Sequence, residues 1–225
     1  MRGQNPIRKP LSGDGLMLDV KHVFATLQGE GPFVGQPSVF VRLGGCNLAC
    51  AFCDTHFEEF TTVALADLLS QVERLALNEA GKRVRRLVVI TGGEPLRQNI
   101  APLCEALLAA GFAVQIETNG TLWRELPEAV TIICSPKNTG TGYMKVRGDL
   151  LPRVRAFKFI ISEHDPMYSH VGEVGQGASG IPVYVQPMDE YDEALNAENL
   201  TLAKRLATEQ GYILSLQVHK ILGIE

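Results

Sequence analysis

Three closely spaced cysteines are the residues in this chain best suited to chemistry. Cys46, Cys50 and Cys53 fall within eight residues, directly after the apolar run at residues 39–43. Clustered thiolates are typical ligands of soft metals and of iron–sulfur clusters. With only three protein ligands, a four-iron cluster keeps one iron open to a small molecule. The spacing therefore favours a redox cluster in the loop that follows a strand.

Other uses of these thiols stay open on the residues alone. A closed zinc site needs four ligands, and His56 is the nearest candidate for the fourth, although so compressed a site would crowd the metal. The thiols could also be reactive or unrelated to one another. A disulfide is disfavoured because the local count is odd and residues 1–15 lack the apolar centre of a signal peptide.

The composition is that of a globular protein without a charged binding surface. The 225 residues are 45% hydrophobic and 20% charged, which is enough for one full core. A net charge of −4 gives no general attraction to nucleic acid or to an anionic membrane, so we expect neither as a partner. No apolar run reaches the roughly 18 residues that span a bilayer. We expect a cytoplasmic protein, because that compartment keeps thiols reduced.

Short apolar runs separated by breakers predict buried strands. They lie at residues 39–43, 87–90, 113–116, 130–134, 157–161, 183–185 and 213–218. Apolar residues at helical spacing predict three helices, which lie over residues 63–80, 100–110 and 195–210. Strands that alternate with helices indicate an α/β fold with a mostly parallel sheet. Because the helices are fewer than the strands, we expect an incomplete (β/α) barrel in a single core domain at residues 19–225, after a flexible extension at residues 1–18.

Polar motifs come directly after several of the predicted strands. In parallel α/β proteins the carboxyl ends of the strands form the ligand-binding face. We therefore expect segments far apart in the sequence to contribute to one pocket. These motifs begin at Gly45, Thr91, Glu117, Ser135 and Gln186.

The cysteine spacing resembles that of the radical S-adenosylmethionine (SAM) enzymes, including an aromatic residue, Phe52, before the third cysteine. The flanking sequence is similar to one family, the 7-carboxy-7-deazaguanine synthases of the queuosine and deazapurine pathway. The likeness runs from about Phe24 to the last residue. Its motifs are Thr26-Leu27-Gln28-Gly29-Glu30-Gly31, Cys53-Asp54-Thr55, Thr91-Gly92-Gly93-Glu94-Pro95, Ile116-Glu117-Thr118-Asn119-Gly120, Ser135-Pro136-Lys137, Gln186-Pro187-Met188-Asp189 and Leu214-Ser215-Leu216-Gln217-Val218-His219-Lys220.

The resemblance implies a [4Fe–4S] cluster on the three cysteines, with SAM bound to its open iron. On the residues alone, the glycine pair before Glu94 fits a plain strand–turn–helix junction equally well. The resemblance implies that further contacts to SAM come from Phe52, Asp54, Gly93, Ser135, Pro136, Lys137, Gln186, Pro187, Met188 and Asp189.

The resemblance also implies a carboxylated pterin as substrate. Arg42 suits a carboxylate because its planar guanidinium binds both oxygens, although a salt-bridged strand residue is the alternative. Thr55 would bind a Mg²⁺ ion that touches the same carboxylate, and its alternative is a helix cap. We expect His219 in the last strand, where a core histidine is the alternative. The implied substrate contacts are Leu27, Gln28, Gly29, Arg42, Thr91, His219 and Glu225.

The implied reaction begins when a radical derived from SAM removes hydrogen from C6 of 6-carboxy-5,6,7,8-tetrahydropterin. The ring then contracts and loses ammonia, which yields 7-carboxy-7-deazaguanine. The family also implies a flavodoxin or ferredoxin as electron donor, and a homodimer. Two other classes stay open: a small radical SAM activase that installs a glycyl radical on a partner protein, and a non-catalytic metal-binding module. Cys104 and Cys134 are expected to be buried packing residues.

Overall fold

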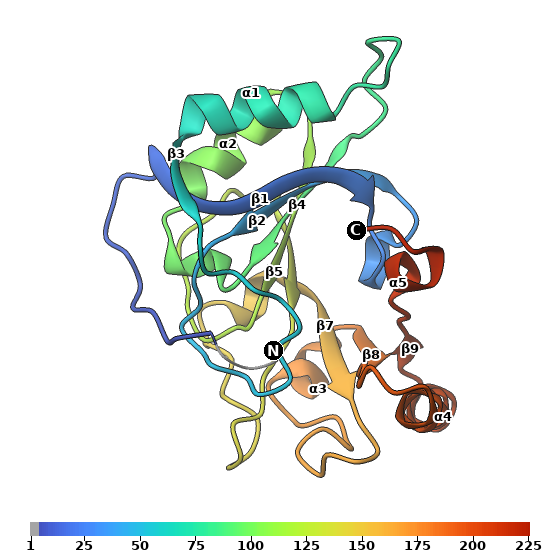
Figure 1. Ribbon diagram of the computed structural model, residues 1–225. Coiled ribbons are helices and arrows are strands. Elements are labelled where there is room, and N and C mark those ends of the chain that lie inside the picture. Colours follow the sequence, from blue (N-terminus) through green and yellow to red (C-terminus); the bar gives the residue numbers. More distant parts are fainter. Residues whose placement is uncertain (1–4) are drawn as a thin grey trace. The chain divides into compact units, whose positions relative to one another are not determined.

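The computed structural model describes residues 5–225 and divides into two compact units (Figure 1). The first unit comprises residues up to 28 together with residues 35–118 and 122–132, and the second comprises residues 29–34, 119–121 and 133–225. The chain passes between the units several times, the last time within strand β6 (Thr131–Cys134). A single core domain over residues 19–225 stays a prediction.

Five strands of the first unit form a sheet in the order β3, β1, β2, β4, β5. Strand β1 is antiparallel to both of its neighbours, whereas β2, β4 and β5 are parallel. The sequence analysis did not predict β1, because polar residues such as Lys21 and His22 interrupt its apolar positions. The strands are β1 (Met17–Leu27), β2 (Pro37–Leu43), β3 (Thr61–Ala64), β4 (Leu87–Gly92) and β5 (Ala113–Thr118).

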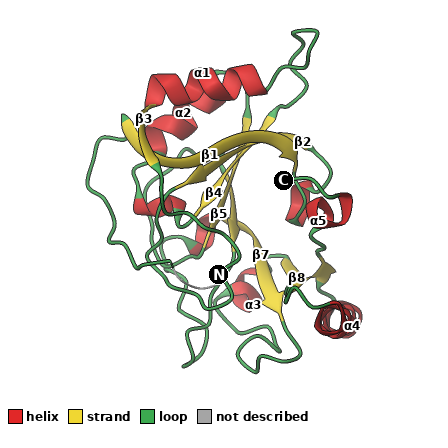
Figure 2. Ribbon diagram, in the orientation of Figure 1, coloured by secondary structure: helices red, strands yellow, loops and turns green. Residues whose placement is uncertain are grey.

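Helices α1 (Leu65–Leu75) and α2 (Ala101–Ala109) pack against each other and against this sheet (Figures 1 and 2). The helix predicted over residues 63–80 is shorter at both ends. Its first residues belong to β3, and its last form a turn in which the Asn78 side chain accepts a hydrogen bond from the Lys82 backbone N–H at 2.9 Å. The second predicted helix is confirmed, and Gly111 follows its end with a φ of 80°.

The second unit holds three parallel strands, β7 (Val154–Ile161), β8 (Val183–Pro187) and β9 (Ile213–Leu214). Helix α4 (Glu193–Gln210) packs on β8. Asp192 caps its first turn by accepting hydrogen bonds from two backbone N–H groups, and Gly211 ends it in the left-handed conformation. The remaining elements are short: α3 (Gln176–Ser179), α5 (Val218–Leu222), and the 3₁₀ turns η1 (Gly31–Phe33), η2 (Pro95–Arg97) and η3 (Leu151–Arg153).

The prediction of a buried strand over residues 213–218 is wrong. Strand β9 contains only two residues, both exposed, and the chain then turns into α5. Ser215 explains where the pairing ends, because its hydroxyl donates to the Gln186 side chain and accepts from the Gly31 N–H, both at 3.1 Å. The Ser215 N–H still donates to the Val185 carbonyl at 2.9 Å, so the pairing with β8 ends at this residue.

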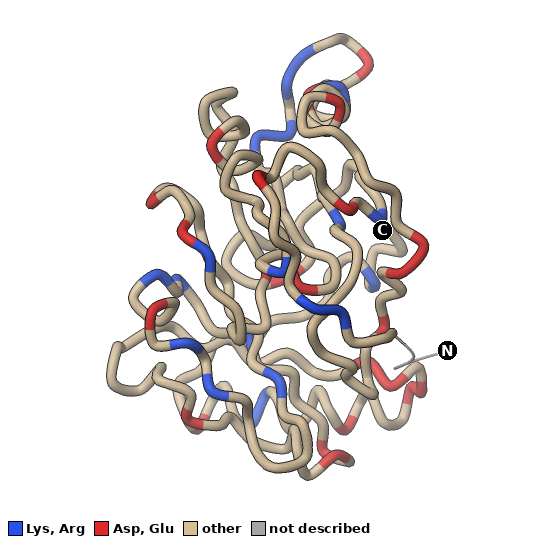
Figure 3. Tube along the Cα trace, turned by 90° about the vertical axis from the view of Figure 1, so that its left-hand side faces the viewer, with Lys and Arg blue, Asp and Glu red and all other residues tan. Residues whose placement is uncertain are grey.

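The predicted fold class, an open α/β arrangement with mostly parallel strands, is confirmed. Strand β3 is an edge strand in the first unit, and β9 is an edge strand in the second. Figure 3 shows Lys and Arg interspersed with Asp and Glu along the chain, in keeping with the small net charge. No helix within residues 5–225 has the length and apolar character to cross a membrane.

Candidate active site

The three predicted cluster ligands lie in a loop that joins β2 to β3, drawn without helix or strand in Figure 2. Cys46 is 8% exposed, and Cys50 and Cys53 are partly exposed. The Cys53 N–H donates to the Cys50 carbonyl at 3.1 Å, which closes a turn between these two cysteines. Within residues 5–225, none of the five cysteines forms a disulfide.

Hydrogen-bond donors point at two of these sulfur atoms. The Leu48 N–H donates to Cys46 Sγ at 3.4 Å, and the Asn5 side-chain amide donates to Cys53 Sγ at 3.8 Å. Burial raises the pKa of the Cys46 thiol to about 12, so iron must displace its proton on binding. Three thiols on one loop with N–H donors nearby fit a [4Fe–4S] cluster.

The same residues 5–225 contain no group of three His, Cys, Asp or Glu side chains arranged to hold a single metal ion. A four-iron cluster does not require that arrangement, because each thiolate binds a different iron. The separation of the three thiols is therefore compatible with the predicted cluster.

The glycine pair at the end of β4 packs directly against the start of the cysteine loop. A Cβ atom on Gly92 would lie 2.1 Å from the Leu43 carbonyl oxygen, and one on Gly93 would lie 2.0 Å from the Gly45 carbonyl oxygen. The Glu94 N–H also donates to Gly45 at 3.1 Å. These glycines thus allow two backbone segments to approach closely, and contact of Gly93 with SAM stays a prediction.

Two buried charged residues beside this junction were not singled out from the sequence as site residues. Arg97 donates to the Asp19 carboxylate at 2.9 Å and to the Gly44 carbonyl at 3.0 Å, just before the first cysteine. Glu94 is fully buried and accepts a hydrogen bond from the Thr118 hydroxyl at 2.7 Å. No pattern in the sequence marks Arg97, whereas Glu94 stands in the conspicuous glycine motif.

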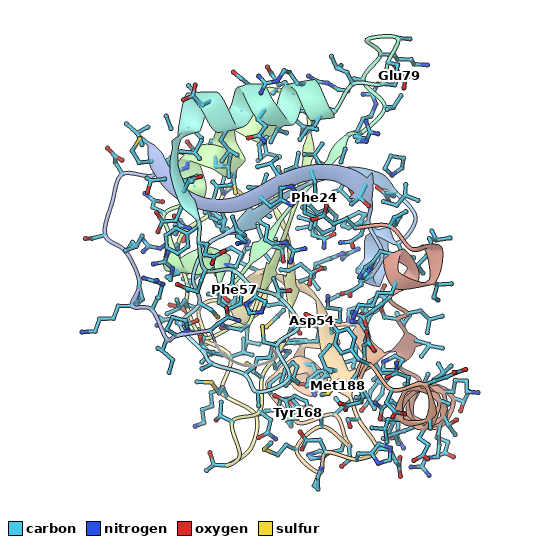
Figure 4. All side chains as sticks on the ribbon, in the orientation of Figure 1. Phe24, Asp54, Phe57, Glu79, Tyr168 and Met188 are labelled. Atoms are coloured by element: carbon cyan, nitrogen blue, oxygen red, sulfur yellow. The ribbon has the colours of Figure 1, made fainter. Side chains whose placement is uncertain are left out.

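The predicted carboxylate ligand and the predicted magnesium ligand lie together in the first unit. Arg42 Nη1 donates to Thr55 Oγ1 at 3.2 Å, and the Thr55 hydroxyl donates to Asp54 Oδ1 at 3.2 Å. Arg42 also lies over the Phe24 ring, 5.6 Å from its centre, and Figure 4 labels both Phe24 and Asp54. Thr91 is the strand partner of Arg42 in the β2–β4 pairing. Thr55 is therefore in contact with Arg42 and caps no helix.

In the second unit, Glu30 and Lys158 form a buried ion pair. Gln217 donates a further hydrogen bond to Glu30 at 3.1 Å. Burial alone would raise the pKa of Glu30, but the charge and hydrogen bond of Lys158, with help from Gln217, hold it at about 2. Lys158 was not predicted as a site residue. Its position inside the buried strand β7 could have marked it, because a lysine is rarely buried without a charged partner.

Two predicted substrate ligands, Gly29 and His219, are brought together in the second unit. A Cβ atom on Gly29 would lie 2.1 Å from His219 Nδ1, so the imidazole occupies the space that a side chain would need. The Val218 N–H donates to the Gly29 carbonyl at 3.0 Å. His219 lies in helix α5 and not in the last strand, which corrects our prediction. Glu225 is exposed at the end of the chain.

The remaining predicted SAM contacts follow β6 and β8 in the second unit. Lys137 donates to the Ser135 hydroxyl at 2.6 Å, and Lys220 donates to Asp189 at 2.8 Å. Burial would raise the pKa of Asp189, but hydrogen bonds from Lys220, the Tyr191 N–H and Asn196 hold it at about 2. Met188, labelled in Figure 4, is buried. These contacts order the loops, and their roles toward SAM stay predictions.

The two cysteines expected to serve packing are both fully buried. Cys104 lies in α2, and burial raises the pKa of its thiol to about 12. Cys134 packs so closely on Gly120 that a Cβ atom there would lie 2.6 Å from its sulfur.

Comparison with known proteins gives a consistent result. Residues 40–134 match the model of the radical SAM superfamily. The chain is 58% identical over 225 residues to the 7-carboxy-7-deazaguanine synthase of Rickettsia prowazekii, covering all of this chain and 96% of that protein. It is 46% identical over 244 residues to the enzyme of the same name from Rhodospirillum rubrum, with both proteins covered in full.

A solved structure agrees with these sequence matches. The crystal structure of QueE from Escherichia coli aligns with a TM-score of 0.70 and 26% identity, and the match covers 93% of this chain and all of that one. The predicted fold, an incomplete barrel of the radical SAM type, is therefore confirmed. The relatives support neither the activase nor the metal-binding module as alternatives. This chain belongs to the 7-carboxy-7-deazaguanine synthase family of the radical SAM superfamily.

Proposed function

We propose that this chain converts 6-carboxy-5,6,7,8-tetrahydropterin into 7-carboxy-7-deazaguanine. As a member of its family it is a lyase that uses a [4Fe–4S] cluster and SAM. The reaction removes only the elements of ammonia from the substrate, so it is redox-neutral overall. When bound, the cluster and SAM supply one-electron chemistry. The observation that best supports this substrate is the contact between Arg42 and Thr55, two residues past Cys53.

Cys46, Cys50 and Cys53 are the proposed ligands of the cluster. The glycine pair of β4 packs against the backbone at the start of their loop, and the Arg97 side chain donates to the Gly44 carbonyl. Phe52 and Asp54 flank the third cysteine and are proposed contacts of SAM.

Arg42 is the proposed partner of the substrate carboxylate. A guanidinium can donate two parallel hydrogen bonds to a carboxylate, which fixes the orientation as well as the position of the pterin. The Thr55 hydroxyl oxygen, which now accepts from Arg42, is the proposed ligand of Mg²⁺. One protein oxygen is sufficient, because magnesium keeps several waters and binds readily to substrate oxygens. Leu27, Gln28 and Thr91 are the other proposed substrate contacts in this unit.

The second unit supplies the remaining proposed ligands. Gly29, His219 and Glu225 are assigned to the pterin. The Glu30–Lys158 pair and the hydrogen bond from Gln217 hold the residue next to Gly29. Polar groups at the ends of β6 and β8 are assigned to SAM, and they are Ser135, Pro136, Lys137, Gln186, Pro187, Met188 and Asp189.

We also propose that this protein receives electrons from a partner protein and that it forms a homodimer. The cluster needs a one-electron donor, for which a flavodoxin or ferredoxin is suited. Light scattering at micromolar concentration distinguishes the proposed homodimer from a monomer. Replacing chemical reductant by either donor protein in the turnover assay tests the choice of donor.

Anaerobic turnover tests the function directly. Reduced protein with SAM, Mg²⁺ and the carboxytetrahydropterin should release a product lighter than the substrate by one ammonia, identified by mass spectrometry. A matched reaction without SAM should give none. Cleavage of SAM without any change in the pterin would contradict the proposal and favour an activase.

A further inference from the structure

The N-terminal segment at residues 5–11 packs against the cysteine loop within the first unit. Ile7 forms an isolated parallel bridge with Cys46, and the Arg8 N–H donates to the Cys46 carbonyl at 2.7 Å. The Arg8 guanidinium pairs with Glu58 and lies over the Phe60 ring at 5.2 Å. The N-terminal segment is therefore bound to the cysteine loop at two places, at Cys46 and at residues 58–60 near the end of the loop.

The Asn5 side chain contacts the cysteine loop beside the third cysteine, Cys53. Its side-chain Nδ2 lies 2.9 Å from the Thr55 carbonyl oxygen and 3.8 Å from Cys53 Sγ, and the residue is 6% exposed. The Thr55 carbonyl oxygen can only accept a hydrogen bond, so reversing the amide would place two oxygen atoms against each other at 2.9 Å. Cys53 is likewise an acceptor when its thiol is deprotonated. The neighbours thus fix the amide with its N–H groups toward Cys53.

This orientation leaves the other end of the amide unsatisfied. Asn5 Oδ1 is buried and has no hydrogen-bond partner within the described chain. An unsatisfied buried acceptor typically costs about 1–3 kcal/mol. A packing residue without polar atoms would avoid this cost, which indicates that the N–H donor is the useful part of the side chain.

We infer that Asn5 is a positioning residue for the cluster, and that its donation to the Cys53 thiolate raises the reduction potential. This inference rests on the proposed ligation of the cluster by Cys53. A hydrogen bond to a ligating sulfur withdraws electron density from iron and stabilises the more negative, reduced cluster. Asn5 therefore makes the first electron transfer easier without touching SAM or the substrate.

The test is a redox titration of the reconstituted cluster followed by electron paramagnetic resonance (EPR). Asn5→Asp keeps the shape but turns an acceptor toward the thiolate. At a fixed potential its ratio of reduced to oxidised cluster should fall about tenfold, equivalent to a midpoint lower by about 59 mV for one electron. Asn5→Ala should shift in the same direction by less.

Asn99→Asp is the matched control. Asn99 donates to the carbonyl of Gly13, which follows the N-terminal segment closely in the sequence, at 3.2 Å, and its hydrogen bonds with Gly13 and Ala101 involve no thiol. Its oxygen also accepts from the Ala101 N–H, and aspartate keeps that contact. The same substitution here should leave the midpoint unchanged. Equal midpoints in wild type, Asn5→Asp and Asn5→Ala would overturn the inference.

A measurement on the wild type keeps the test decisive if neither Asn5 variant retains its cluster. Asparagine labelled with nitrogen-15 in the side-chain amide should couple to the reduced cluster in pulsed EPR, and absence of that coupling would overturn the inference. The proposed ligation is checked separately with Cys53→Ala. A full cluster in that variant would refute the ligand assignment itself, whereas loss of the cluster with an unchanged Asn5→Asp midpoint would refute the role of Asn5 alone.

Discussion

Different interactions hold two regions that carry proposed ligand contacts. One is the cysteine loop of the first unit (residues 44–60), and the other is the Glu30 segment of the second (residues 29–34). Residues 44–60 contain no helix or strand. Side chains hold them at both ends, because Arg97 donates to the Gly44 carbonyl and Arg8 pairs with Glu58. Glu30 is instead fixed by a buried charge pair with Lys158 and by Gln217. The loop is therefore held by hydrogen bonds and an exposed ion pair, whereas the Glu30 segment is held by a pair of opposite charges that is largely shielded from water.

Because of this difference, some substitutions should remove the cluster and others should destabilise the fold. Metal binding and local folding are coupled at a site whose ligands lie on an irregular loop. A buried ion pair contributes to the fold itself, because removing one partner leaves an uncompensated charge. Substitutions in the loop should therefore abolish chemistry with little change in stability, and substitutions at the pair should cost stability first.

The largest effect is expected at the cluster ligands. Cys46→Ala, Cys50→Ala and Cys53→Ala should each abolish activity and the visible absorption of the cluster, because each thiolate binds a different iron and nothing replaces it. Thermal unfolding of the iron-free proteins should stay close to that of iron-free wild type. Iron and sulfide analysis after anaerobic reconstitution measures the first effect.

The two buried cysteines outside the loop are the controls. Cys104→Ala and Cys134→Ala should keep the iron content and the absorption, at some cost in stability from lost packing. Full cluster occupancy in Cys50→Ala, or its loss in Cys104→Ala, would contradict the assignment.

The next largest effect is expected on stability at the buried pair. Lys158→Met should destabilise the fold by about 3–5 kcal/mol at pH 7, because Glu30 is left buried without its cation. Urea unfolding measures the loss. Combining Lys158→Met with Glu30→Gln should recover most of it, since no buried charge remains. Arg147→Met, which breaks an exposed pair with Asp149, should leave stability nearly unchanged.

The stability of the wild type and that of Lys158→Met should depend on pH in different ways. Lys158 holds the pKa of folded Glu30 at about 2, below its ordinary 4.5, so the pair stabilises the fold above pH 4.5 and this contribution is lost as the pH falls toward 2. Without Lys158, burial raises the pKa of Glu30, and acid then relieves the unpaired charge. The stability difference between wild type and Lys158→Met should begin to shrink above pH 4.5, where Glu30 of the variant gains its proton, and should continue to shrink as the pH falls toward 2. A constant difference would contradict this account.

The sequence predicted the parallel strands and the cysteine loop because their signals are local. Runs of Val, Ile and Phe mark β2, β4 and β7, and the cysteine spacing marks the loop. Strand β1 was missed since its antiparallel pairing with β2 leaves several polar residues partly exposed. Helix α5 was missed because it is short and because the N–H of its first residue, Val218, donates to Gly29, which is distant in the sequence.

The proposed site was predictable where residue type and spacing decide the chemistry. The resemblance assigned Arg42 to the substrate carboxylate and Thr55 to a magnesium ion that touches the same carboxylate. In the structure the two side chains form a hydrogen bond. The contacts of Asn5, Arg97 and Lys158 depend on residues more than forty positions away, as in the pairing of Lys158 with Glu30. Such contacts leave no periodic or compositional trace, so only the folded chain reveals them.

A smaller effect, confined to substrate, is expected at Arg42. Arg42→Ala should weaken pterin binding by well over tenfold, because truncating a charge-assisted pair typically costs about 2–5 kcal/mol. Binding of SAM should barely change. Arg42→Lys should recover only part of the affinity, since an ammonium cannot donate two parallel hydrogen bonds. Equilibrium binding of the pterin checks this, and equal affinities would remove Arg42 from the substrate site.

The smallest effect is expected at Thr55, which contacts Arg42 and Asp54 but carries no charge. Thr55→Ala removes one neutral oxygen from the proposed magnesium site, while substrate and water oxygens still bind the ion. The Mg²⁺ concentration for half-maximal rate should rise by about tenfold or less, equivalent to at most about 1.4 kcal/mol. Cluster content and SAM binding should stay the same.

Thr55→Ser distinguishes a metal ligand from a packing residue. Serine keeps the hydroxyl oxygen and loses only a methyl group, so its magnesium dependence should match the wild type. If the methyl group mattered instead, serine and alanine would behave alike. An unchanged magnesium requirement in Thr55→Ala would assign this hydroxyl to orienting Arg42, and the pterin affinity of that variant would then fall while its response to Mg²⁺ stayed the same.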